Sequence, residues 1–272
     1  MPVAESTRIH PTAVISDRCQ IAEDVTIGPF VVIEGDVRIG PRCQIGPYVH
    51  LRGALWLGAR NRIYSGAVLG ERPQHLRFDE AEETRLEIGD DNIIREHVTI
   101  HRGTTHRYVT TIGSHNFFMA GSHVAHDSII GNHCVLANGA LLGGHCILDD
   151  RAIISGNAAV HQFCRVGRVA MLGGNSGTSK DVPPFMIQQG INCITGVNLI
   201  GLRRAGVSSE AIGAVKHAYR RLFKDGLSVK TALERIEAEC GQFEEIQELV
   251  HFIRNSTNGI NPARNHQRGV WP

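Results

Sequence analysis

The chain has 272 residues, 42% of them hydrophobic, with a formal net charge of +1, which is enough for one long domain or two modest ones. The near-zero net charge argues against a nucleic-acid-binding protein, and no apolar run approaches the roughly 20 residues that span a bilayer. The first residues show no secretory signal, and the seven cysteines include no Cys-x-x-Cys pair. We therefore expect reduced thiols and a cytoplasmic location, without a transmembrane segment.

An apolar residue recurs every six positions in two long runs. All twenty-two positions of these runs are apolar, where a composition of 42% hydrophobic residues would give about nine by chance. The first run is Ile9, Ile15, Ile21, Ile27, Ile33, Ile39, Ile45, Leu51, Leu57, Ile63 and Leu69, and the second is Ile112, Phe118, Val124, Ile130, Leu136, Leu142, Leu148, Ile154, Val160, Val166 and Leu172.

Glycine often follows these apolar anchors directly, and the residue four places after an anchor is mostly small. Five of the seven cysteines occupy that small position, which marks them as packing residues (Cys19, Cys43, Cys134, Cys146 and Cys164). An anchor, a corner and a small buried residue in every six make the hexapeptide repeat of a parallel β-helix. Three repeats close one coil of 18 residues, so the sequence predicts a mainly β solenoid.

The period is interrupted twice and then ends. Non-periodic stretches near 71–85 and 103–110 predict two loops on a solenoid that spans 8–190, with His106 in a missing anchor position. From residue 191 to 260 the spacing of apolar residues becomes helical, with helices expected after Ser208, around Val229–Ile236 and around Ile246–Ile253. We expect a small α-helical C-terminal domain and a disordered tail over 261–272.

Nine of the fifteen histidines lie between His97 and His161. Residues 18 apart stack in one column of the solenoid, at about the 4.8 Å spacing of neighbouring strands. One such column is His126, Gly144 and Gln162, and the next is Asp127, His145 and Phe163. A base one coil from a glycine N–H and two coils from an amide side chain is the arrangement that acyl transfer needs.

Two simpler explanations compete with this one. Most histidines at the corners of such a solenoid are structural and face solvent. A zinc site of the β-helical carbonic anhydrase type would need two histidines five apart and a third upstream. Only His101 and His106 have that spacing, and Ser65 occupies the upstream column, so we predict no metal site.

Five short motifs together resemble the UDP-N-acetylglucosamine O-acyltransferase family of lipid A biosynthesis: Ile-His-Pro-Thr-Ala at 9–13, Ile-His-Arg-Gly-Thr at 100–104, Val-Ala-His-Asp at 124–127, Val-His-Gln-Phe at 160–163 and Asp-Val-Pro-Pro at 181–184. The resemblance runs from about residue 8 to 260. It implies a left-handed β-helix, a homotrimer with active sites between subunits, and no cofactor. The implied reaction moves a 3-hydroxyacyl group from acyl carrier protein to the sugar 3-hydroxyl, the first step of lipid A biosynthesis.

The resemblance also implies roles for particular residues. His126 would be the general base with Asp127 beside it, and the Gly144 N–H would bind the oxyanion. His145 and Gln162 would contact the sugar and the acyl group, and Gly174 lies where the family measures acyl chain length. Further implied contacts are His123 and His161 in the cleft and Asn198 and Arg204 on the nucleotide.

The chain also departs from the family pattern. His75 and Arg77 stand in the first loop where many members have Asp and Lys, and Ile200 and Ala205 replace a Glu and an Arg near the nucleotide. The segment Ile191–Ile194 is one residue short. These changes leave open a different acceptor, such as a UDP-diamino sugar that would be N-acylated. A zinc-binding trimer and an inactive scaffold also compete with the O-acyltransferase function.

Overall fold

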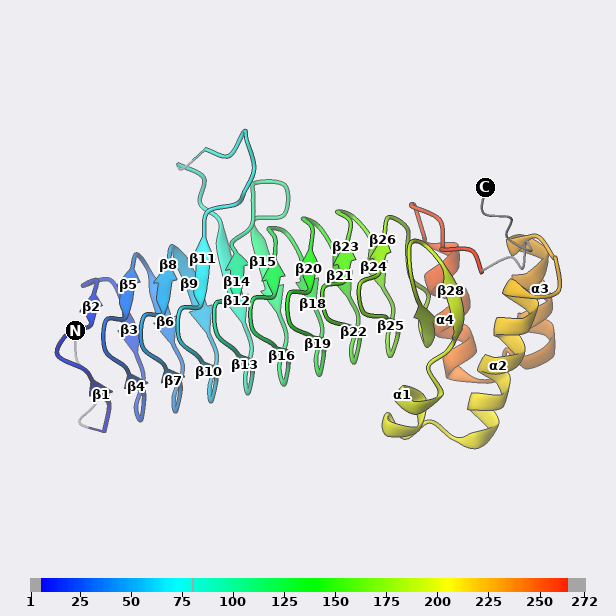
Figure 1. Ribbon diagram of the computed structural model, residues 1–272, viewed down its shortest axis with the longest axis horizontal. Coiled ribbons are helices and arrows are strands. Elements are labelled where there is room, and N and C mark those ends of the chain that lie inside the picture. The colour runs from blue at the N-terminus through cyan, green and yellow to red at the C-terminus, as the bar shows by residue number, and fades with distance from the viewer. Residues whose placement is uncertain (1–5, 80, 264–272) are drawn as a thin grey trace, which may run out of the picture.

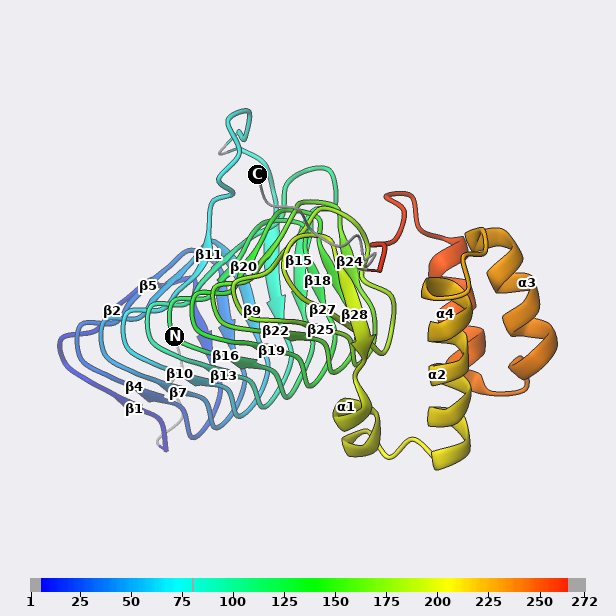
Figure 2. The same cartoon turned by 45° about the vertical axis from the view of Figure 1, so that its right-hand side comes forward.

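The computed structural model describes residues 6–79 and 81–263. Its strands form three long sheets, A, B and C, which make the three sides of a triangular solenoid (Figures 1 and 2). The chain visits the sheets in turn, so every third strand lies in the same sheet, hydrogen-bonded to the coils before and after it. The predicted left-handed parallel β-helix with a small helical domain is confirmed.

The strands are two to four residues long. Sheet A contains β1 (Arg8–Ile9), β4 (Thr26–Ile27), β7 (Gln44–Ile45), β10 (Arg62–Ile63), β13 (Ile93–Ile94), β16 (Phe117–Phe118), β19 (Val135–Leu136), β22 (Ile153–Ile154), β25 (Met171–Leu172), β27 (Met186–Gln188) and β28 (Ile194–Val197). Sheet B contains β2 (Val14–Ile15), β5 (Val32–Glu34), β8 (His50–Arg52), β11 (Val68–Glu71), β14 (Thr99–His101), β17 (His123–Val124), β20 (Leu141–Leu142), β23 (Ala159–Val160) and β26 (Gly177–Thr178). Sheet C contains β3 (Gln20–Ile21), β6 (Val37–Ile39), β9 (Ala54–Leu57), β12 (Arg85–Ile88), β15 (Val109–Ile112), β18 (Ile129–Ile130), β21 (Ile147–Leu148) and β24 (Arg165–Val166).

The six-residue anchors form the core of the solenoid. Every anchor from Ile21 to Leu172 is buried, whereas Ile9 and Ile15 in the first coil are only partly covered because no coil lies below them. Each buried aliphatic side chain stabilises the fold by about 1.5–3 kcal/mol. The anchors stack in register, as in the pairing of Val124 with Leu142 and of Leu142 with Val160.

Both predicted loops leave the solenoid at the corner between sheets B and C (Figures 1 and 2). The first connects β11 to β12, and the second connects β14 to β15. The loops do not disturb the stack, because Ile63 still pairs with Ile94 and Ile94 with Phe118. They therefore stand side by side over one corner while the coils remain regular.

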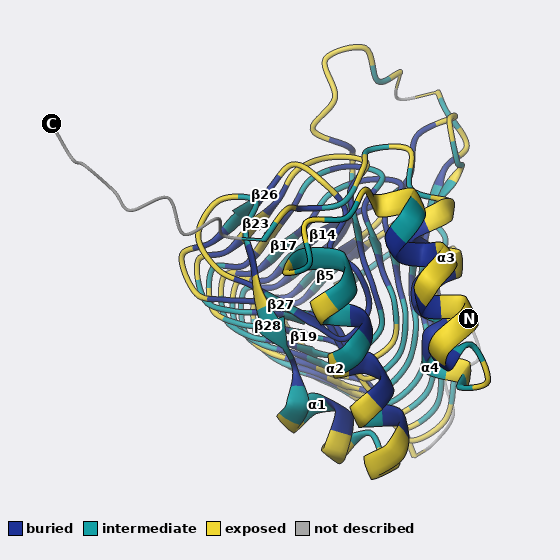
Figure 3. Ribbon diagram, turned by 90° about the vertical axis from the view of Figure 1, so that its right-hand side faces the viewer, coloured by how far each residue is buried: buried dark blue, intermediate teal, exposed yellow. Residues whose placement is uncertain are grey.

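The solenoid ends in an antiparallel pair, β27 and β28, so sheet A continues to Val197, beyond the predicted boundary at 190. Four helices follow: α1 (Leu199–Arg204), α2 (Ser209–Phe223), α3 (Val229–Cys240) and α4 (Glu244–Arg254). Ser208 and Ser228 cap α2 and α3 with their side chains, as expected for helix starts. The sequence did not predict α1. Figure 3 shows the buried faces of the helices turned inward and their exposed faces turned to solvent.

The C-terminal segment stays packed on the solenoid longer than predicted. Asn261 is fully buried, and its side-chain amide donates to Thr178 Oγ1 and Gln188 Oε1, each at 2.8 Å. The prediction that the chain is disordered from residue 261 is therefore wrong for 261–263, the part of the tail that the structure describes. Residues 264–272 lie outside the described residues. Within the described part of the chain, no helix combines the length and the hydropathy needed to cross a membrane.

Candidate active site

His126 lies at the corner between β17 and β18, the same corner of the solenoid that carries the two loops in the preceding coils. The structure contains the predicted columns. The His145 N–H donates to the His126 carbonyl at 2.9 Å, and the Phe163 N–H donates to the Gly144 carbonyl at 3.0 Å. Asp127 and His145 take up the left-handed backbone conformation that turns this corner, at φ of 60° and 62°. Consecutive coils thus bring the predicted residues together.

His126 and Asp127 form a close hydrogen-bonded pair. His126 Nδ1 lies 2.8 Å from Asp127 Oδ2, and the Asp127 side chain is completely buried. Burial opposes the negative charge, but hydrogen bonds from His126 and Thr104 outweigh it and hold the pKa of the Asp127 carboxyl below its usual value. A carboxylate can only accept, so the proton of the neutral imidazole is on Nδ1. Nε2 therefore carries the lone pair that can take a proton from a substrate.

Gly144 lies directly against this imidazole. A Cβ at Gly144 would be 2.7 Å from His126 Cε1 and 2.9 Å from Nε2, closer than real Cβ contacts. The neighbouring Gly143 and His145 N–H groups bond to the carbonyls of Val160 and His126, whereas the Gly144 N–H donates to no acceptor among the described residues. The site therefore places an available N–H donor beside the histidine, as the stabilisation of an oxyanion requires.

Several other imidazoles surround the pair. The His145 ring is 5.2 Å from His126, and its Nε2 is 3.6 Å from Asp127 Oδ2. The loops add two more, because His75 lies 5.6 Å from the His126 ring and His106 lies 4.8 Å from the His145 ring. Burial lowers the pKa of His145, although Asp127 opposes the shift. The neutral form of His145 therefore predominates at pH 7.

His123 occupies the outward face of sheet B in the same coil as His126. Its Nδ1 is 2.7 Å from Thr99 Oγ1, and its ring packs at 4.9 Å on His101. Burial lowers the pKa of His123, and it lowers the pKa of His101 to about 4. These two residues are therefore neutral neighbours of the site.

The remaining predicted residues of this group are exposed. His161 and Gln162 follow β23 at the same corner as His126, and Arg77 lies in the first loop, whereas Gly174 follows β25 at the corner between sheets A and B. A Cβ at Gly174 would meet only Gly156 O at 3.6 Å, so the space beside Gly174 is open as expected.

The predicted nucleotide contacts lie on a different face. Asn198 and Arg204 line a groove of about 630 Å³ between α1 and the outer face of sheet A. Asn198 is buried and caps α1, accepting from the Gly201 N–H and donating to the Val169 carbonyl. Arg204 is exposed, and the two departures Ile200 and Ala205 line the same groove. One chain therefore does not bring Asn198 and Arg204 together with His126.

The described residues contain one cluster with three potential metal ligands, His126, Asp127 and His145, whose ligand atoms lie within 4.8 Å of one another. Both Asp127 oxygens already accept hydrogen bonds, and Oδ2 accepts from His126 Nδ1. The geometry thus fits a proton-transfer network. His101 and His106 point to different partners, His123 and His145.

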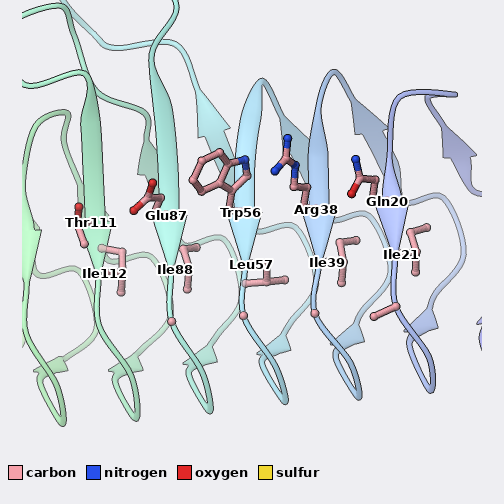
Figure 4. A pocket seen from close by; sticks show the side chains of 14 residues that line it. Gln20, Ile21, Arg38, Ile39, Trp56, Leu57, Glu87, Ile88, Thr111 and Ile112 are labelled. Atoms are coloured by element: carbon pink, nitrogen blue, oxygen red, sulfur yellow. The ribbon is translucent and has the colours of Figure 1, made fainter.

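A groove of about 710 Å³ follows the outer face of sheet C, away from the predicted residues (Figure 4). Figure 4 shows an outward row that includes Arg38, Trp56 and Glu87, beside an inward row of aliphatic anchors. The guanidinium groups of Arg38 and Arg85 lie 5.0 and 4.8 Å from the centre of the Trp56 ring. These side chains stabilise neighbouring coils, and none of them faces His126.

Comparison with known proteins assigns the chain to a family. It is 47% identical over 256 residues to the acyl-[acyl-carrier-protein]–UDP-N-acetylglucosamine O-acyltransferase of Halorhodospira halophila, covering 93% of this chain and 99% of that protein. The chain belongs to the UDP-N-acetylglucosamine O-acyltransferase family. The family model for domain 2 of these O-acyltransferases matches residues 181–261, and a bacterial transferase hexapeptide model matches 110–144.

Solved structures of UDP-N-acetylglucosamine acyltransferases agree over nearly the whole chain. The enzyme of Francisella novicida superposes with a TM-score of 0.91 at 36% identity, covering 94% of this chain and 95% of that one. The enzyme of Bacteroides fragilis gives 0.89 at 44% identity, covering 93% and 99%. The predicted family and its acyltransferase class are therefore confirmed for this chain.

Sequence reasoning missed three residues that contact the site: two threonines bonded to Asp127, and His106, which packs on His145. Thr104, Thr110 and His106 come from the second loop and its ends, and the threonines bond directly to Asp127. The loop itself was predicted, but the six-residue period gives no register inside it. One signal was present, because Thr104 ends the Ile-His-Arg-Gly-Thr motif at 100–104.

Proposed function

We propose that this protein transfers a 3-hydroxyacyl group from acyl carrier protein to the 3-hydroxyl of UDP-N-acetylglucosamine, the first step of lipid A biosynthesis. The observation that carries the proposal is the pairing of His126 with buried Asp127 at 2.8 Å, next to the Gly144 N–H. The curated relative from Halorhodospira halophila is named for the same donor and acceptor. We also propose a cytoplasmic location, which the seven cysteines, all unpaired thiols, support.

In the proposed reaction, His126 Nε2 takes the proton of the acceptor hydroxyl as its oxygen attacks the thioester carbonyl. The carbonyl oxygen becomes negatively charged and accepts a hydrogen bond from the Gly144 N–H. Collapse of the tetrahedral intermediate breaks the carbon–sulfur bond, and the imidazolium returns the proton to the leaving thiolate. Asp127 stabilises the imidazolium while it holds the positive charge.

The other site residues receive substrate-binding roles in this proposal. His145 and Gln162 contact the sugar and the acyl group, and Gly174 leaves room for the end of the chain. His123 and His161 line the cleft, and His75 and Arg77 extend over the acceptor from the first loop.

Separation of the nucleotide groove from His126 supports a homotrimer. Asn198 and Arg204 lie over sheet A, whereas His126 is at the corner between sheets B and C. One acceptor molecule contacts both groups if a neighbouring subunit supplies the nucleotide groove. The outer face of sheet A also offers a partly exposed apolar row suited to subunit contact: Phe117, Val135, Ile153 and Met171.

Replacement of His126 tests the proposal. His126→Ala should keep the thermal midpoint and the oligomeric state of the wild type but lower kcat by at least the 10²–10⁴-fold typical of general-base catalysis. Mass spectrometry with hydroxyacyl carrier proteins of several lengths, offered with UDP-N-acetylglucosamine or its 3-amino analogue, identifies the product. Near-normal turnover of His126→Ala would exclude His126 as the base. Amide formation without ester formation would identify a diamino sugar as the acceptor.

A further inference from the structure

The second loop begins with a threonine that reaches the active-site carboxylate. The Thr104 N–H donates to Asp127 Oδ1 at 2.9 Å, and the Thr104 hydroxyl donates to Asp127 Oδ2 at 2.7 Å. Thr104 is 8% exposed and Asp127 is fully buried, so water has little access to either bond. Both Asp127 oxygens therefore have a donor from one loop residue, 23 positions earlier in the chain.

A second threonine holds the backbone of the same residue from the other end of the loop. Thr110, in β15, is fully buried, and its Oγ1 accepts the Asp127 N–H at 2.8 Å. The first loop supports this arrangement, because Glu82 Oε2 accepts the Thr105 N–H at 3.2 Å. The extra residues of the second loop are thus fixed at both ends to the corner of the next coil.

Asp127 Oδ2 accepts from two groups, the Thr104 hydroxyl and His126 Nδ1. The bonds from Thr104 hold the plane of the carboxylate, and with it the direction of the Oδ2 lone pair that accepts from the imidazole. The hydroxyl also shares the negative charge that would otherwise be offered to the imidazolium alone. Loss of the hydroxyl should loosen the orientation of His126 and strengthen its attraction for a proton.

We infer that Thr104 is a positioning residue, which acts through Asp127 to hold His126 in the Nδ1–H form with Nε2 toward the substrate. This inference rests on the proposed acyl transfer but concerns a residue that does not touch the reacting groups. The Thr104 hydroxyl and N–H act on Asp127, and Asp127 acts on the imidazole. The second loop is therefore part of the catalytic apparatus.

The test compares three variants. Thr104→Val removes the hydroxyl and keeps the shape and the N–H, Thr104→Ser restores the hydroxyl, and Thr111→Val is the matched control. Thr111 lies in β15 next to Thr110 and faces the outer side of sheet C. Thr104→Val should lower kcat roughly tenfold, in line with loss of the hydrogen bond to the charged carboxylate, while KM changes little. The substitution also removes the acceptor of the His106 N–H, which Thr104 Oγ1 accepts at a longer 3.3 Å. Thr104→Ser should recover most of the loss, and Thr111→Val should resemble the wild type.

Two readouts separate positioning from a structural role. The acid limb of kcat/KM against pH should move to higher pH in Thr104→Val, because the carboxylate then holds the imidazole proton more strongly. Every variant keeps the other titratable or charged groups near this pair, so they contribute equally to each profile: His75, His106, Arg107, His123 and His145. Imidazole ¹⁵N shifts should show the Nδ1–H form of His126 in the wild type and a mixture of forms in Thr104→Val.

A Thr104→Val enzyme with normal kcat and an unmoved acid limb would overturn the inference. A fall in thermal midpoint with an unmoved limb and unchanged ¹⁵N shifts would also overturn it, in favour of a purely structural role. The ¹⁵N measurement needs no turnover. A wild type that transfers no acyl group but shows the expected shifts would therefore defeat the proposed function and leave the positioning role standing.

Discussion

Gly144 is the position where a single methyl group should test the site most directly. In Gly144→Ala the new Cβ would stand 2.7 Å from His126 Cε1 and 2.9 Å from Nε2. Ordinary contacts begin at 3.4 Å, so the imidazole must recede by about 0.7 Å. The 2.8 Å bond to Asp127 resists that movement, because Thr104 holds Asp127 in turn.

We expect kcat of Gly144→Ala to fall between ten- and a hundredfold, since a displacement of about 1 Å at a reacting group costs roughly 10²-fold. The Gly144 N–H survives the substitution, so the loss would report the position of the histidine and not the oxyanion donor. Overpacking of this kind costs about 1–3 kcal/mol when neighbours cannot move. The thermal midpoint, measured beside kcat for the acyl-carrier-protein donor, shows how much of the strain remains in the folded state.

Gly156→Ala is the matched control, because Gly156 occupies the equivalent position of the hexapeptide two repeats later, at the corner between sheets A and B. Its added Cβ would meet only Asn138 O, at an ordinary 3.5 Å. Gly156→Ala should leave kcat and the midpoint near those of the wild type. A Gly144→Ala enzyme with unchanged kcat would refute the reasoning, because it would mean that the imidazole is free to move without loss of catalysis.

Two further predictions concern the acyl pocket and the junction with the helical domain. Gly174→Met should shift the preferred donor toward shorter chains, at roughly 0.8 kcal/mol for each excluded methylene, and an unchanged chain-length profile would place the pocket end elsewhere. Burial raises the pKa of Asp149 to about 6, with Arg165 opposing and Glu248 reinforcing the shift. The folded state therefore favours the protonated acid. Ionisation of Asp149 lowers the free energy of unfolding as pH rises from about 4, the pKa in the unfolded chain, to about 6, by at most roughly 3 kcal/mol. Asp149→Asn should raise the thermal midpoint at pH 8 and have little effect near pH 4; equal effects at both pH values would contradict the assignment.

The solenoid could be predicted because the same pattern of buried side chains repeats in every coil. Each coil buries the same kind of side chain at the same interval, so an error at one position does not propagate, and the anchors from Ile21 to Leu172 are buried as expected. The short helix α1 could not be predicted in this way. Its six residues have only one buried side chain, Leu202, and therefore leave no periodic pattern.

The catalytic column followed from the same repeat, since residues 18 apart must stack. The interruption of the repeat hid the rest of the site. His75 and His106 reach His126 and His145 from non-periodic loops, and the direction of a loop depends on contacts that spacing does not encode. For Asn198 the sequence indicated the residue but not its structural role. The resemblance identified it as a nucleotide contact, and only the structure reveals that its side chain also caps α1.

The exposed face of α2 provides a last prediction, on recognition of the acidic carrier protein. Lys216 and Arg220 are exposed and four residues apart, so they share one face of the helix, and exposed Lys224 follows as its C-cap. Arg220 has a 75% exposed side chain, with Asp225 at 3.4 Å as its ion-pair partner. Arg221 differs, because it bonds to both Asp225 and Glu239 and thereby ties α2 to α3. We therefore expect the exposed face to dock the carrier and Arg221 to serve stability.

Charge reversal separates docking from an ordinary solvated face. Arg220→Glu with Lys224→Glu should raise KM for the carrier-bound donor and reduce its dependence on salt, because steering weakens as the Debye length falls from about 10 Å at 0.1 M to about 3 Å at 1 M. A small carrier-free thioester should be affected little. Lys230→Glu with Arg235→Glu on α3 is the matched control, since both side chains are exposed. Equal losses with the two donors, or an equal effect of the α3 pair, would mean that charge on this face of α2 has no particular part in docking.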